Sequence, residues 1–165
     1  QFHDGKGEMT AEDVRYSFER YTDDKSISSN KGLLLGIVEK LEVAGPHEIT
    51  FHLKAPDVTF AGRVSNGQFG VVSKKYFEAV GDTEAIAKPV GTGPFRLIEH
   101  RRQESVTFAA VSPHWRHTAG FQTLVLRRVP DQSARLAMLR SGEIDLTEVP
   151  YKLDRKSTRL NSSHT

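Results

Sequence analysis

The sequence contains no cysteine among its 165 residues. This absence excludes thiol catalysis, disulfide bonds and zinc–thiolate sites, and it leaves the redox compartment undecided. No apolar run approaches the ~20 residues that a membrane-spanning helix needs. A starting methionine and a signal peptide are also missing, because the chain opens at Gln1. We therefore expect it to be an internal piece of a longer protein.

An excess of charge of one sign is absent from most of the chain. The last twelve residues, 154–165, are polar and aperiodic, and they match the translation of a common sequencing-adapter oligonucleotide. We expect this segment to be a disordered scar, with a genuine basic tail as the alternative. It holds three basic residues and one acidic residue, so the other 153 residues carry 20 of each sign. This balance predicts no nucleic-acid or anionic-membrane partner.

The glycine-rich segment PVGTGPFRLIEH, residues 89–100, lacks what phosphate binding requires. A phosphate loop needs a lysine and free backbone N–H groups at a helix start, but Gly93 is followed by Pro94, which has no N–H. A dinucleotide fingerprint also fails, because its third glycine would fall at Arg96. Apolar residues alternate from Phe95 onward, which is typical of a strand. We therefore predict a turn that leads into a strand.

Apolar residues at helical spacing predict a helix that begins after Thr10. Thr10 is the N-cap candidate, and Asp13 three residues later completes a near capping box. Val14, Phe18 and Tyr21 would then form one apolar face. Capping and glycine signals predict further helices over residues 57–64, 74–80 (ended by Gly81) and 133–141 (between Asp131 and Gly142), with a polar loop over residues 22–32.

Alternating apolar residues predict strands, most of them in antiparallel hairpins. In the first hairpin Leu41 and Val43 would lie on one face, as would Ile49 and Phe51 on the returning strand. The expected strands span residues 37–43, 49–53, 71–72, 95–100, 105–111, 122–129 and 144–149. The last two, joined by a helix, would form a β–α–β step that suits a parallel pair. The predicted fold class is α+β with mostly antiparallel strands.

Four motifs in order carry a resemblance to a known family. They are FHDG with TAEDV (residues 2–5 and 10–14), GTGPF (91–95), SPHW (112–115) and DQSARLAMLRSGEIDL (131–146). On these motifs the chain resembles the family 5 extracellular solute-binding proteins, the dipeptide, oligopeptide and nickel class of ABC importers. Five turn and surface positions depart from the family pattern: Gly7, Glu8, Gln103, Ser112 and His114. These departures leave the subfamily open, whereas the expected fold is unaffected.

The resemblance implies a type II periplasmic-binding-protein-like lobe fragment whose second large lobe is missing. Residues 1–88 would belong to the smaller lobe and residues 89–153 to the main lobe, up to the crossing between lobes. The GTGPF turn would lie where the chain passes from the smaller lobe into the main one. The motif positions expected to be structural are Asp4, Gly5, Thr10, Asp13, Gly91, Gly93, Pro94, Trp115, Asp131, Gly142 and Asp145.

The resemblance also implies a binding function without catalysis or a cofactor. The protein would be a monomer that captures a peptide or similar small polar solute by lobe closure and delivers it to ABC permease subunits. Its location would be periplasmic or extracellular and membrane-anchored. The alternatives are a solute-sensing domain of a transcriptional regulator and a nickel or metal-chelate binder of the same family. The ligand-binding residues, chosen by position at the cleft edge, are Arg63, Asn66, Gln68, Phe69, Glu148, Pro150 and Tyr151.

Catalytic and metal sites have little support in the residues themselves. The chain has no G-x-S-x-G elbow, so a hydrolase triad has no local basis. His114 and His117 stand at a spacing that can hold a metal, but no third ligand is near them in sequence, and we predict no metal site. The carboxylate pairs at residues 12–13 and 143 with 145 are expected to be solvated or salt-bridged.

Overall fold

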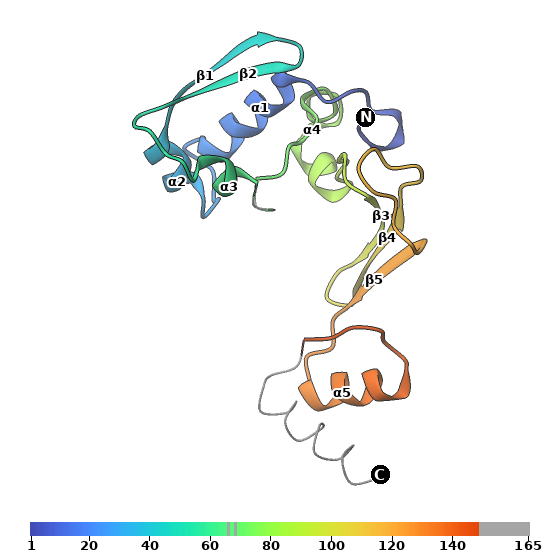
Figure 1. Cartoon of the computed structure of the whole chain (residues 1–165). Helices are drawn as coiled ribbons and strands as arrows, with labels where there is room; N and C mark the ends of the chain where they lie inside the picture. The colour runs from blue at the N-terminus through green and yellow to red at the C-terminus, as the bar shows by residue number, and fades with distance from the viewer. Residues whose placement is uncertain (66, 68, 149–165) are drawn as a thin grey trace. The chain divides into compact units, whose positions relative to one another are not determined.

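A computed structural model of the chain describes residues 1–65, 67 and 69–148 (Figure 1). These residues form two compact units, one made of residues 1–99 and 107–124 and the other of residues 100–106 and those from 125 onward. Helices and antiparallel sheets are mixed, which confirms the predicted α+β class. Among the described residues, no helix has the length and apolarity needed to cross a membrane.

The first unit begins with a single 3-10 turn, η1 (His3–Gly5), followed by helix α1 (Ala11–Thr22). This turn has positive φ angles of 56° at Asp4 and 67° at Gly5. Helix α1 starts at Thr10 as predicted, because the Asp13 carboxylate accepts hydrogen bonds from the Thr10 N–H at 2.7 Å and hydroxyl at 2.9 Å. This capping box fixes where the helix begins.

Strands β1 (Val38–Gly45) and β2 (Glu48–Leu53) form the predicted antiparallel hairpin. Leu41 lies opposite Phe51 and Val43 opposite Ile49, so the apolar residues share one face. Phe51 meets Phe18 of α1 edge-on, with ring centroids 6.3 Å apart. The hairpin therefore packs its apolar face against the first helix (Figure 1).

Helix α2 (Lys31–Ile37) was not predicted. It replaces the end of the expected loop at residues 22–32 and the expected strand start at residue 37. Leu34 is only 3% exposed, so burial of this side chain explains why the KGLLLGI segment is helical rather than extended.

Helices α3 (Phe60–Val64) and α4 (Lys74–Ala87) differ in length from the prediction. The first is shorter than residues 57–64. The second is interrupted at Gly81, where φ is 79°, and then resumes, so the expected glycine stop is only a break. The strand expected at residues 71–72 is wrong, because the Val72 N–H donates to a side chain, Ser17 Oγ, at 2.9 Å instead of to a neighbouring strand.

A buried apolar cluster of the first unit lies between α1 and α4. Tyr76, Phe77 and Ala85 of α4 are buried, and Tyr16 of α1 packs against them with its ring 6.1 Å from that of Phe77. This core is small, so polar contacts around it have an important part in holding the two helices together.

A three-stranded sheet has the order β3 (Phe95–Arg101), β4 (Ser105–Ala110) and β5 (Thr123–Arg127). It confirms the second predicted hairpin and the strand that follows. Gln103, where the family often has glycine, takes a φ of 68° in the hairpin turn. This left-handed conformation explains why glycine suits the position.

The second unit contains helix α5 (Gln132–Ser141), which begins and ends as predicted. The Asp131 carboxylate accepts from the Ala134 N–H at 2.7 Å, and Gly142 ends the helix with a φ of 75°. The strand expected at residues 144–149 is wrong for residues 144–148, and Val149 lies outside the described residues. The parallel β–α–β step is therefore wrong in the described part of the chain. A strand exists only by pairing, and residues 144–148 have no neighbouring strand there.

Candidate functional site

Three of the sequence motifs meet at the GTG turn of the first unit. His3 holds the turn at both glycines: its backbone N–H donates to the Gly91 carbonyl at 2.9 Å, and its ring Nε2 donates to the Gly93 carbonyl at 2.9 Å. The Gly91 N–H in turn points at His3 Nδ1, 3.4 Å away. The FHDG motif therefore fixes a turn almost ninety residues further along the chain.

The SPHW motif holds the residue between the two glycines. His114 Nε2 and Trp115 Nε1 both donate to the Thr92 carbonyl, each at 3.0 Å. His114 Nδ1 accepts from the backbone N–H groups of Arg116 and His117 at 3.3 Å. Since a carbonyl only accepts and an amide N–H only donates, Nε2 is the donor and Nδ1 the acceptor in these contacts.

Both ring nitrogens of His114 are therefore engaged in holding the backbone. Within residues 1–65, 67 and 69–148, no group of three or more histidine, aspartate or glutamate residues is placed to hold a metal ion. In the GTG turn, the carbonyl oxygens of all three residues 91–93 accept hydrogen bonds from motif residues.

Asp13 joins the starts of two helices. Besides capping α1, its carboxylate accepts from the backbone N–H of Lys74, the first residue of α4, at 2.8 Å. Asp13 is only 6% exposed. Because helix N-termini present unpaired N–H groups and a positive dipole end, one buried carboxylate stabilises both helices.

Ser17 continues this polar contact one turn along α1, and the sequence analysis did not predict its role. Its hydroxyl donates to the Asp13 carbonyl at 2.7 Å and accepts from the Val72 N–H at 2.9 Å. The buried residues of α1 are Ala11, Asp13 and Ser17. Val14, Phe18 and Tyr21, which form the expected apolar face, are only half-buried. A serine four residues after Asp13 was the available signal, but its partner is a backbone group far away in sequence.

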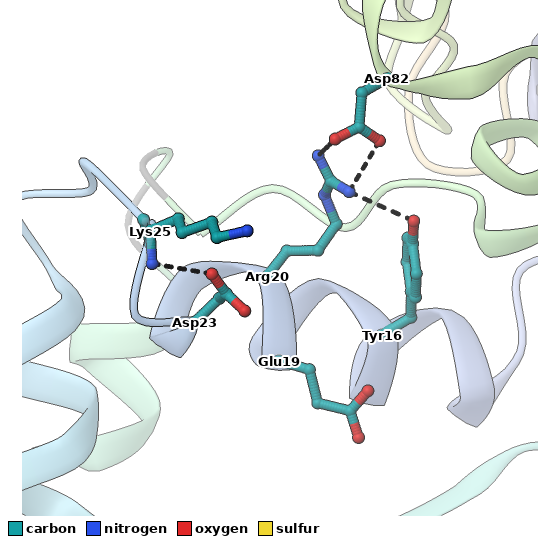
Figure 2. A pocket seen from close by; sticks show the side chains of 7 residues that line it. Tyr16, Glu19, Arg20, Asp23, Lys25 and Asp82 are labelled. Atoms are coloured by element: carbon teal, nitrogen blue, oxygen red, sulfur yellow. Dashed lines mark hydrogen bonds and ion pairs between the residues drawn. The ribbon is translucent and has the colours of Figure 1, made fainter.

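A hollow of about 400 Å³ opens beside the C-terminal half of α1. Figure 2 shows its charged and aromatic lining: Tyr16, Glu19, Arg20, Asp23, Lys25 and Asp82, with Ser26 completing it. Arg20 forms two hydrogen bonds with the Asp82 carboxylate, at 3.0 and 3.1 Å, and a third with the Tyr16 hydroxyl at 3.3 Å. The carboxylate of Asp82 raises the pKa of Arg20.

The guanidinium of Arg20 also lies over the Phe77 ring, 4.4 Å from its centroid. Its charge is thus already matched by Asp82 and its planar face is covered. The arrangement joins α1 to the second half of α4, after the break at Gly81. We interpret this ion pair as a structural contact.

The motifs that meet at the GTG turn belong to one known family. Residues 1–163 match the bacterial extracellular solute-binding proteins, family 5 middle. The chain belongs to this family. Di/tripeptide-binding protein 2 of Pseudomonas aeruginosa (strain UCBPP-PA14) is 29% identical over 173 residues, which cover 96% of this chain and 32% of that protein. The chain spans about a third of the length of the curated relatives that it matches.

Solved structures of solute-binding proteins share the fold. The periplasmic binding protein DppA from Helicobacter pylori, in complex with the peptide STSA, matches with a TM-score of 0.79 and 29% identity over 87% of this chain and 32% of its own. NikZ from Campylobacter jejuni, in complex with Ni(L-His), matches with a TM-score of 0.75 and 25% identity over 87% of this chain and 28% of its own. The fold of this family 5 chain therefore corresponds to about a third of a type II periplasmic-binding protein.

The residues predicted to contact the ligand lie in both units of this family 5 chain. In the first unit Arg63 is exposed on α3, where its Nε donates to Thr59 Oγ1 at 2.7 Å and lies 3.5 Å from the Asp57 carboxylate. The Phe69 ring meets the Tyr21 ring edge-on at 5.8 Å. Glu148 is exposed in the second unit. The other four predicted residues, Asn66, Gln68, Pro150 and Tyr151, lie outside the described residues.

The carboxylate pairs were expected to be solvated or salt-bridged, and the contacts of three members test this expectation. Glu12 forms ion pairs with Arg15 at 2.7 Å and Lys74 at 3.6 Å, and the hydrogen bond from Arg15 lowers the pKa of Glu12. Glu143 pairs with Arg127 at 2.9 Å. Both observations confirm salt-bridged carboxylates. Asp13 is the exception, because it is buried and hydrogen-bonded to backbone amides.

Proposed function

We propose that the longer protein to which this chain belongs captures a peptide or a similar small polar solute and delivers it to ABC permease subunits in the membrane. The family match over residues 1–163 carries this proposal. Support comes from relatives that are named as di/tripeptide-binding proteins and from the shared fold with a DppA bound to a peptide. The location is then periplasmic or extracellular, with a membrane anchor, and the protein works as a monomer.

The mechanism is closure of two lobes around the solute without chemical conversion. The solute must bind the closed form more tightly than the open one, since a ligand shifts an equilibrium only by that difference. Hydrogen bonds to the peptide backbone suit a carrier of varied peptides, because every peptide offers the same backbone groups. We propose that cleft-edge residues of this chain take part, with Arg63, Phe69 and Glu148 as its described members and Asn66, Gln68, Pro150 and Tyr151 as the others.

A metal chelate is the second candidate solute. NikZ, which shares the fold at 25% identity, was solved with Ni(L-His). The relatives named above are solute-binding proteins of transport systems, so the alternative of a transcriptional regulator gains no support from them.

The test is ligand-dependent stability of the intact protein. A panel of di-, tri- and longer peptides, sugars and nickel with histidine is added, and thermal unfolding is followed. A solute present at a hundredfold excess over its dissociation constant is expected to add about 3 kcal/mol to the free energy of unfolding. Stabilisation by peptides alone supports the first candidate, and stabilisation by nickel with histidine alone supports the second. No shift with any member of the panel contradicts the proposal.

A further inference from the structure

A second hollow of about 590 Å³ adjoins the one beside Arg20 and lies wholly in the first unit. The two hollows share Arg20, Lys25 and Ser26. The second extends along the C-terminal end of α1 and the loop that follows it, toward residues 70–72 and α4. Its remaining lining residues are Ser17, Tyr21, Ile27, Ser28, Gly70, Val72 and Ile86.

The charges in this second hollow are all positive. Its lining includes two cations and no carboxylate, whereas the first hollow is lined by Glu19, Asp23 and Asp82 as well. Arg20 is already paired with Asp82. Lys25 differs, because among the described residues only its backbone N–H forms a hydrogen bond, which it donates to the Asp23 carboxylate at 2.8 Å. Within the described part of the chain its ammonium forms no ion pair, and Figure 2 shows the side chain extended toward Arg20.

Two serine hydroxyl groups line the same hollow as this ammonium. Ser26 Oγ accepts from the Ser28 N–H, and Ser28 Oγ accepts from the Asn30 N–H, both at 3.3 Å. Each hydroxyl therefore uses its oxygen to hold the loop and keeps its hydrogen available as a donor. An ammonium with neighbouring O–H donors favours an anionic oxygen ligand.

The walls of the same hollow are apolar and uncovered. Ile27 is fully exposed, at 101%, and Ile86 is 66% exposed. The ring of Tyr21 adds a third apolar surface, held in place because its hydroxyl donates to the Gly70 carbonyl at 3.1 Å. Covering isoleucine side chains with an apolar group is favourable in proportion to the area removed from water.

We propose that this hollow binds a small organic anion that carries a carboxylate on a short aliphatic tail. The carboxylate binds at Lys25 and the hydroxyls of Ser26 and Ser28, and the tail covers Ile27 and Ile86. The proposal does not depend on the solute capture proposed above, although Phe69 of the proposed cleft edge contacts Tyr21 of this hollow. A free carboxylic acid and the C-terminus of a peptide offer this same chemistry, so both are tested.

The experiment follows the isoleucine methyl resonances of the whole chain by NMR at neutral pH. The probes are N-acetyl-leucine, which represents a peptide C-terminus, hexanoate, which represents a free acid, and N-acetyl-leucinamide, which has the same tail without the charge. We expect N-acetyl-leucine to shift Ile27 and Ile86 and to bind about fivefold more tightly than the amide, the upper range for one partly exposed ion pair. Hexanoate binding as tightly as N-acetyl-leucine indicates a site for free acids.

Two variants and a control locate the contacts. Lys25→Gln is expected to abolish the preference for the acid over the amide, while Lys75→Gln, an exposed lysine of α4 outside the hollow, retains it. Ile27→Ser is expected to weaken both probes alike. The proposal is overturned by equal affinities for acid and amide, by an unchanged preference in Lys25→Gln, or by the absence of methyl shifts at Ile27 and Ile86 with about 10 mM probe. A negative result here would not contradict peptide capture by the longer protein, because that proposal is tested separately, by thermal unfolding with a different panel of ligands.

Discussion

Replacing Asp13 by alanine is expected to destabilise the first unit strongly. The carboxylate is 6% exposed and accepts from the Thr10 N–H, the Thr10 hydroxyl and the Lys74 N–H at 2.7, 2.9 and 2.8 Å. Alanine leaves two backbone N–H groups without their partner, and each such group costs about 1–3 kcal/mol. The hydroxyl can rotate toward water. Because helix ends are partly hydrated, we expect a loss of about 3 kcal/mol in the free energy of unfolding.

Replacing Asp13 by asparagine tests whether one acceptor oxygen is enough to bind the N-termini of both helices. Its amide offers one acceptor oxygen, so either Thr10 or Lys74 keeps its hydrogen bond and the other N–H faces the amide NH₂ group. The expected loss is about 2 kcal/mol, between the wild type and alanine. Ser17→Ala tests the neighbouring contact and is expected to cost about 1–2 kcal/mol, because the Val72 N–H loses its acceptor.

The assay is urea unfolding followed by far-ultraviolet circular dichroism, with the slope m compared between variants so that a change in midpoint reports stability. Glu8→Gln is the matched control, because Glu8 is an exposed carboxylate two residues before the same helix cap. The reasoning is refuted if Asp13→Ala unfolds at the same urea concentration as Glu8→Gln. It is also refuted if asparagine is as stable as aspartate.

Three further contacts give predictions of the same kind. Arg20→Gln is expected to lower stability by about 1 kcal/mol, since it removes a partly exposed ion pair with Asp82 and a contact with an aromatic face, and calorimetry of the two proteins measures it. His114→Ala is expected to shift the emission of Trp115, the only tryptophan, whereas His114→Gln, which keeps a donor, restores it; equal spectra would contradict the assigned contacts. Burial raises the pKa of Tyr21 above its ordinary value of 10.0, so its contribution to stability is present below pH 10 and is lost as the pH rises through the raised value. Tyr21→Phe should reduce this alkaline loss in unfolding measured from pH 8 to 11.

Helix caps and the first hairpin could be predicted from the sequence, because the residues that form them are close together in the chain. The capping box at Thr10 and the caps of α5 at Asp131 and Gly142 depend on groups within a few residues of each other, so the sequence contains both partners. The first hairpin depends on alternation around a glycine–proline turn and is equally local. The motifs pointed to the family for the same reason, because each is a short continuous segment.

Elements that depend on distant partners were not predictable. The KGLLLGI segment became α2 because Leu34 is buried against other elements, and residues 144–148 lack a strand because nothing in the described part of the chain pairs with them. The candidate ligand residues could be proposed from their position along the chain, but their neighbours depend on segments far away in sequence.

The residues set the order of motifs, the caps and the turn chemistry, because these involve only short-range hydrogen bonds and backbone preferences. Only the tertiary structure showed that His3, His114 and Trp115 donate hydrogen bonds to one turn. It also showed that Asp13 accepts hydrogen bonds at the starts of two helices. Lys25, whose ammonium forms no ion pair among the described residues, lines the same hollow as Ile27 and Ile86. Each of these involves groups brought together by packing of separate elements. Since local periodicity contains no information about which backbone amide or side chain will lie opposite, such contacts appear only once the chain is folded.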